Sequence, residues 1–243
     1  MARKTTSSKR KKAPAKKKAP AKPRFRPMAW VWRGVLSFLL AVVVWVAAYA
    51  VIPPPTTPYI LSEAVKQNGI TRDWVPAEDI APVMLRSVVA AEDANFCLHW
   101  GIDMRALRAS IEDGANRGAS TLSQQTVKNV WLWHGRSWPR KALEAVMTPV
   151  VEAIWSKRRI LEVYLNVAEF DTGVFGIEAA AQHHFGVSAD ALTARQASLL
   201  AAVLPNPKER QAVNPSEFVQ RRARAIADGA ATIRADGRAS CFE

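Results

Sequence analysis

The feature that most constrains the fold is an uncharged apolar run of 19 residues, from Gly34 to Ile52. At about 1.5 Å per residue, a helix of this length spans a hydrocarbon core of about 30 Å. A cleaved signal peptide would have a shorter apolar region and a small-residue cleavage motif, whereas three prolines follow here. We therefore predict a retained transmembrane anchor over residues 28–52 and a Pro-rich linker over 53–58. Aromatic residues typical of membrane interfaces accompany the run: Trp30, Trp32, Trp45 and Tyr49.

Charge is distributed unevenly on the two sides of this run. The net charge is +13, but residues 1–33 contain 13 Lys or Arg and no acidic residue, while the other 210 residues carry 21 basic and 21 acidic side chains. The low-complexity segment 1–27 cannot bury enough apolar surface to fold, so we predict a disordered basic tail. Positive charge stays in the cytoplasm, which predicts a single-pass protein of the bacterial inner membrane with a periplasmic domain over 59–243. A tail that binds nucleic acid is the alternative.

The domain after the linker is predicted to be mainly helical. Apolar residues at helical spacing predict helices over 80–94 and 140–166, and a third helix is expected over 173–186. No strand pattern or internal repeat is convincing, and residues 59–78 show no clear period. Pro149 should kink or break the second helix. Cys97 and Cys241 are the only cysteines, and a bond between them stays open for an oxidising compartment.

Helix-start signals mark three further positions. Asp79 can cap the helix over 80–94, with Pro82 in its first turn. Thr193 and Gln196 fit a capping box that opens a helix to Leu204. A last helix is expected to run to about Ala235. Its start would have Asn214 as the N-cap, Pro215 at N1 and Glu217 at N3.

Two glutamates are candidate catalytic groups. Glu92 ends an apolar helix, where desolvation and the helix dipole both raise the pKa of a carboxylate, so it could exchange protons; an ordinary solvated helix end is the alternative. His99 follows closely and could orient this segment. Glu144 lies near Arg140 and Lys141. Lys141 and Glu144 form either an ordinary surface ion pair or part of a cationic cradle for phosphate with a carboxylate beside it.

Polar and aromatic side chains cluster between these glutamates. The loop and helix over 117–129 present neutral hydrogen-bonding groups suited to sugar hydroxyls and phosphates. The segment 130–139 contains three tryptophans, which we expect either in the core or in a patch that meets the bilayer. His183 and His184 are adjacent on a helix, so we expect them not to face one metal site. The tryptophans are Trp131, Trp133 and Trp138.

Five motifs in order resemble the monofunctional peptidoglycan glycosyltransferases, the single-domain relatives of the glycosyltransferase half of bifunctional penicillin-binding proteins. The resemblance covers roughly residues 56–235. It departs from the family pattern at Ala119, Pro149 and Asp171. The motifs are AEDANFCLHWG from Ala91, RGASTLSQQ from Arg117, RKALE from Arg140, KRRILEVYLN from Lys157 and RQASLLAAVLPNP from Arg195.

The resemblance implies roles for the candidate residues. Glu92 matches the catalytic base and Glu144 the second essential carboxylate. A hydroxyl and amide set would line the substrate site, and a basic set would face the donor pyrophosphate. The first set is Ser120, Thr121, Gln124 and Gln125, and the second is Lys128, Arg136, Arg140 and Lys141.

The implied fold is lysozyme-like, a large helical lobe with a smaller membrane-proximal lobe, preceded by one transmembrane helix. The implied reaction polymerises lipid II into β-1,4-linked glycan and releases undecaprenyl pyrophosphate. A divalent cation, Mg²⁺ or Mn²⁺, is compatible with it, and no organic cofactor is implied. Expected partners are lipid II, the growing glycan, membrane lipids and cell-wall synthesis or division proteins, but not nucleic acid.

Two other functions stay open. A membrane-anchored lytic transglycosylase or lysozyme-like hydrolase would also use a glutamate in a helical cleft, but it has no need of a basic cluster. A basic-tailed membrane adaptor is the non-enzymatic alternative. Ser-x-x-Lys occurs only at Ser8, in the tail, without an accompanying Lys-Thr-Gly, so we expect no transpeptidase activity.

Overall fold

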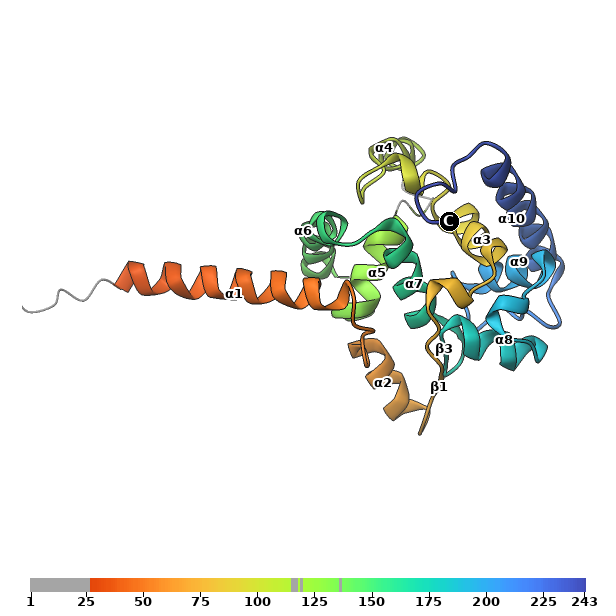
Figure 1. Ribbon diagram of the computed structural model, residues 1–243, viewed down its shortest axis with the longest axis horizontal. Helices are drawn as coiled ribbons and strands as arrows, with labels where there is room; N and C mark the ends of the chain where they lie inside the picture. Colours follow the sequence, from red (N-terminus) through yellow and green to blue (C-terminus); the bar gives the residue numbers. More distant parts are fainter. Residues whose placement is uncertain (1–26, 115–117, 119, 136) are drawn as a thin grey trace, which may run out of the picture. The chain divides into compact units, whose positions relative to one another are not determined.

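The computed structural model describes residues 27–114, 118, 120–135 and 137–243, and these residues are mainly helical (Figure 1). The predicted basic tail, apart from Pro27, lies outside the described residues. The chain divides into two units, residues 1–40 and 41–243. The second unit contains the described candidate site residues.

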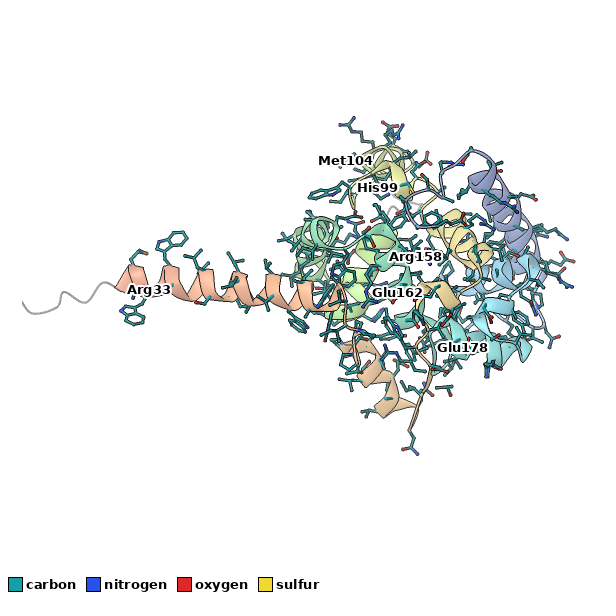
Figure 2. All side chains as sticks on the ribbon, in the orientation of Figure 1. Arg33, His99, Met104, Arg158, Glu162 and Glu178 are labelled. Atoms are coloured by element: carbon teal, nitrogen blue, oxygen red, sulfur yellow. A yellow bond between two sulfur atoms is a disulfide. The ribbon has the colours of Figure 1, made fainter. Side chains whose placement is uncertain are left out.

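Helix α1, Pro27–Tyr49, contains the apolar run. Its segment Trp30–Tyr49 is long and apolar enough to cross a membrane, with a mean hydropathy of 2.1. Apolar side chains project all around this helix, as Figure 2 shows. One N-terminal helix suited to a membrane anchor is thus confirmed.

The last turns of α1 pack against the body. Val46 is buried, and its carbonyl accepts a hydrogen bond from Trp155 Nε1 at 2.8 Å. The carbonyl of Tyr49 accepts from Arg159 Nη2 at 3.0 Å. The final carbonyls of a helix lack intrahelical donors, so these side chains satisfy groups that would otherwise need water.

The helices that follow α1 form two groups, and the helices within each group pack on one another (Figure 1). Helices α3, α9 and α10 pack on one another, while α5 packs on α2, α6 and α7, and α8 packs on α7. The helices are α2 (Pro58–Lys66), α3 (Pro82–Glu92), α4 (Met104–Glu112), α5 (Leu122–Trp131), α6 (Trp138–Ile154), α7 (Lys157–Val167), α8 (Ile177–Phe185), α9 (Ala194–Val203) and α10 (Glu217–Ala235). Short 3₁₀ turns are η1 (Ala77–Asp79), η2 (Phe96–Leu98) and η3 (Ala189–Ala191).

Two predicted helix starts need correction. Asp79 does not cap α3, because it ends η1 and Ala81 occupies the N-cap position. Ser216, rather than Asn214, caps α10, and its side chain accepts from Val219 N. The capping box of Thr193 in α9 and the end of α10 at Ala235 are confirmed.

Pro149 does not divide the long predicted helix. Helix α6 runs through it, and the chain leaves the helix at Trp155, whose backbone is extended. Ser156 then starts α7 by accepting a hydrogen bond from Arg159 N at 3.1 Å. The break therefore lies where a serine can cap a new helix, several residues after the proline.

A small three-stranded sheet, absent from the prediction, lies beside α8. It contains β1 (Thr71–Arg72), β2 (Glu169–Asp171) and β3 (Val174–Phe175), in the order β1-β3-β2. Strand β3 pairs in parallel with β1 and antiparallel with β2. Strands of two or three residues are too short to show an alternating pattern, so the sequence could not reveal them.

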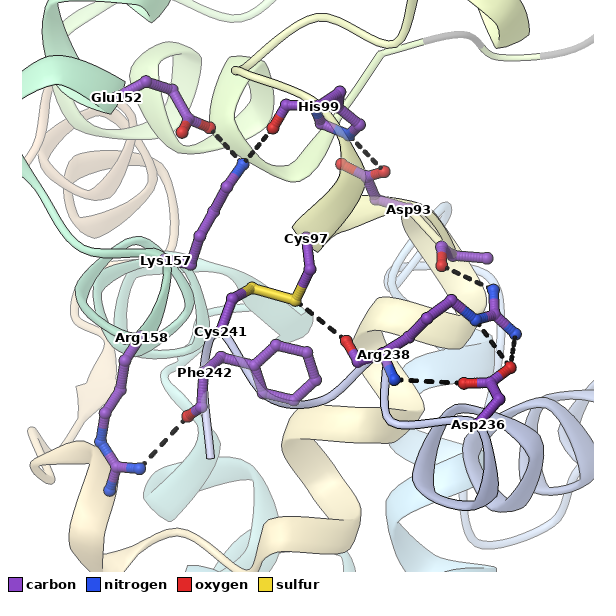
Figure 3. The surroundings of a disulfide bond; sticks show 11 residues. Asp93, Cys97, His99, Glu152, Lys157, Arg158, Asp236, Arg238, Cys241 and Phe242 are labelled. Carbon is purple, nitrogen blue, oxygen red and sulfur yellow. Dashed lines mark hydrogen bonds and ion pairs between the residues drawn. A yellow bond between two sulfur atoms is a disulfide. The ribbon is translucent and has the colours of Figure 1, made fainter.

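The C-terminal segment is tied to the chain just after α3 (Figure 3). A disulfide joins Cys97 to Cys241, so the pairing that the sequence left open is formed. Arg238 Nη1 donates to the carbonyl of Ala94 at 2.9 Å, and Phe242 is buried against Phe96. These contacts hold the residues that follow Glu92 against the body.

Candidate active site

Glu92 is the last residue of α3 and has a largely buried side chain, with 14% exposed. Its Oε2 accepts a hydrogen bond from Gln125 Nε2 at 2.9 Å, whereas Oε1 has no hydrogen-bond partner among the residues that the structure describes and lies 3.7 Å from Arg222 Nη2. Burial raises the pKa of Glu92, and the hydrogen bond from Gln125 and the charge of Arg222 act in the opposite direction. A carboxylate with a raised pKa and a free oxygen is suited to accept a proton.

The neighbouring carboxylate, Asp93, has a structural role. Its Oδ2 accepts from Leu122 N at 3.0 Å, and its Oδ1 lies 2.8 Å from His99 Nε2. Lys157 Nζ in turn donates to the carbonyl of His99 at 2.9 Å (Figure 3). The first motif is thereby fixed to the starts of α5 and α7, which holds Glu92 in place.

The polar side chains of the second motif have two roles: some stabilise the fold, and one contacts Glu92. Thr121 and Gln124 form the capping box that opens α5, and both are nearly fully buried. Thr121 Oγ1 also donates to the carbonyl of Gly101 at 2.6 Å. Gly101 has a positive φ of 82°, and a Cβ there would lie 2.6 Å from Thr148 Cγ2, so only glycine fits. Gln125 is the member that reaches Glu92.

Three cations surround the second candidate carboxylate. Glu144 is 2% exposed and accepts hydrogen bonds from Arg140 Nη1 and, at 2.6 Å, from Lys141 Nζ. Lys141 Nζ also donates to Ser120 Oγ at 3.0 Å. Burial lowers the pKa of Lys128, and Glu144 is the largest influence that raises it. One buried glutamate thus holds a cluster with excess positive charge, the environment an anion requires. Arg136 lies outside the described residues.

The Glu92–Gln125 hydrogen bond joins two residues that line different cavities. Glu92 lines one of about 220 Å³, together with Asn95, Ser120 and Thr121. Gln125 lines the other, of about 310 Å³, together with Lys128. The hydrogen-bonded pair therefore joins the linings of two cavities, and Lys128 of the basic cluster lines the larger one.

The larger cavity contains functional groups that the sequence did not reveal. Tyr59 Oη donates to Glu169, and Lys208 Nζ donates to Glu63 Oε2 at 2.6 Å. Burial lowers the pKa of His134 to about 4, so its ring is neutral at pH 7. Lys208 directly follows the fifth motif, which was a signal available in the sequence. Tyr59 and Glu63 lie in a segment without a period and offered none.

The tryptophan-rich segment is split between core and surface. Trp138 is 89% and Trp133 46% exposed, and Val146 on α6 is also exposed. Trp131 instead packs against Tyr49 and Trp155, with ring centroids 6.0 and 5.5 Å away. The exposed-patch alternative is therefore wrong for Trp131, because its ring packs between Tyr49 at the end of α1 and Trp155 at the C-cap of α6.

The expectation for the paired histidines is also wrong. His183 and His184 both direct Nε2 toward Asp171, at 3.7 and 3.8 Å from Oδ2. The imidazoles are long enough to reach across the end of α8, so adjacent helical positions do share one site here. None of these three residues lines the two cavities beside Glu92.

Comparison with known proteins gives a consistent family match. Residues 60–231 match the family described as Transglycosylase. A biosynthetic peptidoglycan transglycosylase of Jannaschia sp. is 68% identical over 213 residues, covering 88% of this chain and 89% of that protein. Proteins with the same name from Caulobacter vibrioides and Pseudomonas fluorescens are 46% identical over 203 residues and 48% identical over 210. Each alignment covers 82% of this chain and 89% or 88%, respectively, of the relative.

Proposed function

The chain belongs to the transglycosylase family and is a peptidoglycan glycosyltransferase, and we propose that it polymerises lipid II into β-1,4-linked glycan with release of undecaprenyl pyrophosphate. The observation that carries this proposal is that Glu92 lines one cavity and accepts a hydrogen bond from Gln125, which lines a second cavity together with the cation Lys128. A polymerase needs a place for a donor and for an acceptor, and the two cavities supply both.

Glu92 acts as the general base in this proposal. The acceptor hydroxyl oxygen forms a bond to the anomeric carbon of the donor while its proton passes to Glu92, and the bond from that carbon to the pyrophosphate oxygen breaks. Gln125 and Arg222 hold the carboxylate. The oxygen Oε1, which no side chain or backbone group in the described part of the chain hydrogen-bonds, is the atom available to the proton.

The departing pyrophosphate is stabilised by Lys128, Arg140 and Lys141. Glu144 holds Arg140 and Lys141 in place by two ion pairs and compensates part of their charge. A divalent cation would be held by the phosphates of the substrate and by Glu144, provided that the carboxylate gives up one of these ion pairs. The cation would add positive charge at the leaving group.

The anchor and the exposed aromatic side chains suit a substrate that carries a long lipid. We propose that the basic tail lies in the cytoplasm and that residues from about 56 lie in the periplasm. The Cys97–Cys241 disulfide supports this orientation, since disulfides persist in oxidising compartments. A reporter enzyme that works only in the periplasm should be active when fused after Glu243, and an inactive one would exclude the orientation.

The function is tested with purified full-length protein and lipid II in detergent. Polymer should form, and Glu92→Gln should reduce turnover by about 10²–10⁴ while lipid II binding persists. Glu217→Gln is the matched control, because this glutamate is exposed at the start of α10. Near-normal turnover in Glu92→Gln would remove Glu92 from the role of base.

The hydrolase and adaptor alternatives are separated by substrate. Isolated cell wall replaces lipid II in a parallel reaction, and its consumption with lipid II untouched would establish a hydrolase instead.

We expect no cross-linked product and no acylation by β-lactams. A protein lacking residues 1–27 should keep its turnover, whereas an adaptor would lose its main binding segment.

A further inference from the structure

Three metal-ligating side chains meet at the end of the small sheet, away from the cavities beside Glu92. Asp171 ends β2, and His183 and His184 lie in the last turn of α8. The candidate ligand atoms of the three residues all lie within 4.8 Å of one another. The two imidazole centroids are 4.8 Å apart with an interplanar angle of 81°, so the rings converge without stacking.

The orientation of Asp171 leaves one oxygen for the histidines. Its Oδ1 accepts a hydrogen bond from Thr172 N at 2.7 Å, which fixes the carboxylate. Its Oδ2 lies 3.7 Å from His183 Nε2 and 3.8 Å from His184 Nε2. These separations are too long for hydrogen bonds, so the three groups face one another without bonding.

His184 gives the second, independent observation. Its side chain is only 5% exposed, and its Nε2 is buried without a hydrogen-bond partner among the described residues. A buried polar nitrogen without a partner costs free energy, unless a ligand occupies the space that it faces. Here the space in front of that nitrogen is the one between Asp171 and His183.

We propose that Asp171, His183 and His184 form a binding site for a divalent transition metal, with Zn²⁺ as the best match. Two imidazoles and one carboxylate are a ligand set that Zn²⁺ takes readily, whereas Mg²⁺ and Ca²⁺ prefer oxygen ligands. With metal–ligand bonds of about 2.1 Å, neighbouring ligand atoms of a tetrahedral site lie about 3.4 Å apart, close to the two separations of 3.7 and 3.8 Å between Asp171 and the histidines. Water completes the coordination.

The site would fasten the β2–β3 hairpin to α8. Strand β2 also carries Glu169, which accepts the hydrogen bond of Tyr59 in the larger cavity. A metal at Asp171 would therefore hold a strand that supports this cavity, at a position separate from the pyrophosphate cluster. The inference is independent of the proposed substrate, because it needs only the three ligands and their geometry.

Metal-free full-length protein in detergent is titrated with Zn²⁺ and with Co²⁺, whose visible spectrum reports tetrahedral coordination. We expect one equivalent to bind to the wild type. Asp171→Asn, His183→Gln and His184→Gln should each weaken binding by about tenfold or more. His134→Gln is the control for loss of an imidazole elsewhere, and Glu92→Gln is the control for binding beside the cavities; both should bind as the wild type does.

Thermal unfolding gives a second readout. At a free Zn²⁺ concentration about 100-fold above Kd, the Tm of the wild type should rise by about 5–10 °C, and that of Asp171→Asn should not. Asp171 and His183 are partly exposed, so their variants keep the fold even if His184→Gln does not. Wild-type affinity in Asp171→Asn and His183→Gln, or loss of binding in Glu92→Gln, would overturn the proposal.

Discussion

Gln125 Nε2 donates a hydrogen bond to Glu92 Oε2 at 2.9 Å, joining the first turn of α5 to the last residue of α3. Tyr164 Oη donates to Gln125 Oε1 at 3.3 Å, so the amide is oriented with its NH₂ group toward the carboxylate. Two residues from different motifs, 33 positions apart in the sequence, thus form one hydrogen-bonded unit. This unit makes the proton affinity of Glu92 depend on a neutral side chain of another helix.

Gln125→Ala should move the acid limb of kcat/KM to higher pH. The hydrogen bond favours the charged form of Glu92 and lowers its pKa, so its loss lets the pKa rise further. The base is then protonated, and inactive, at a higher pH than in the wild type. The pH profile with lipid II measures this shift, and Gln220→Ala on α10 is the control. An unchanged acid limb would mean that a group other than Glu92 sets it.

Glu92→Gln should raise the Tm at neutral pH although it removes activity. Burial raises the pKa of Glu92 above its ordinary 4.5, so the folded state disfavours the charged form. The resulting loss of stability is absent below about 4.5, where the group is protonated in both states, grows as pH rises above that value, and is complete once pH has passed the raised pKa. Thermal unfolding at several pH values should show the gain at pH 7 and its disappearance near pH 4. An equal gain at both would contradict the electrostatic cause.

Glu144→Gln should raise the KM for lipid II, alter the dependence of turnover on Mg²⁺, or both, with less effect on kcat than Glu92→Gln. The glutamate holds Arg140 and Lys141, so its neutralisation leaves two cations without their buried partner. Turnover is measured across lipid II and Mg²⁺ concentrations. Glu209→Gln, at an exposed position after α9, serves as the control. Unchanged KM and Mg²⁺ dependence would separate Glu144 from the pyrophosphate.

Replacing Trp133 and Trp138 with Ala should weaken liposome binding by a protein that lacks residues 1–55. Both side chains are exposed, so they can enter the interface without disturbing the core. Trp131→Ala is the contrasting variant: its ring packs on Trp155, and its loss should lower the Tm. Liposome co-sedimentation and thermal unfolding distinguish the two effects. Unchanged binding by the double variant would assign the exposed tryptophans to another surface.

Loss of the disulfide should destabilise the fold by about 2–5 kcal/mol, as estimated for closing a long loop. Cys97 and Cys241 are separated by 144 residues, so the bond strongly restricts the unfolded chain. Chemical unfolding of the variant with both cysteines changed to Ser is compared with that of the oxidised wild type. The reduced wild type should match the double variant, and equal stability in all three would show that the bond does not form.

Features encoded within a few neighbouring residues could be predicted from the sequence. The apolar run predicts α1, the Thr193–Gln196 spacing predicts the start of α9, and the apolar period places Glu92 at the end of a buried helix. The start of α10 was misplaced because the sequence offered two neighbouring residues that both suit an N-cap. Asn214 and Ser216 both suit an N-cap, and Ser216 is the one used in the helix that packs on α3 and α9.

The sequence by itself determined the anchor, the helical body and the motifs that carry the glutamates, because these depend on local periodicity and residue type. Only the tertiary structure decided which side chains meet across long separations. Examples are Lys208 with Glu63, the pairing of the two cysteines, and Asp171 with the adjacent histidines of α8. Such contacts depend on how helices and short strands pack, and neither periodicity nor propensity records that geometry.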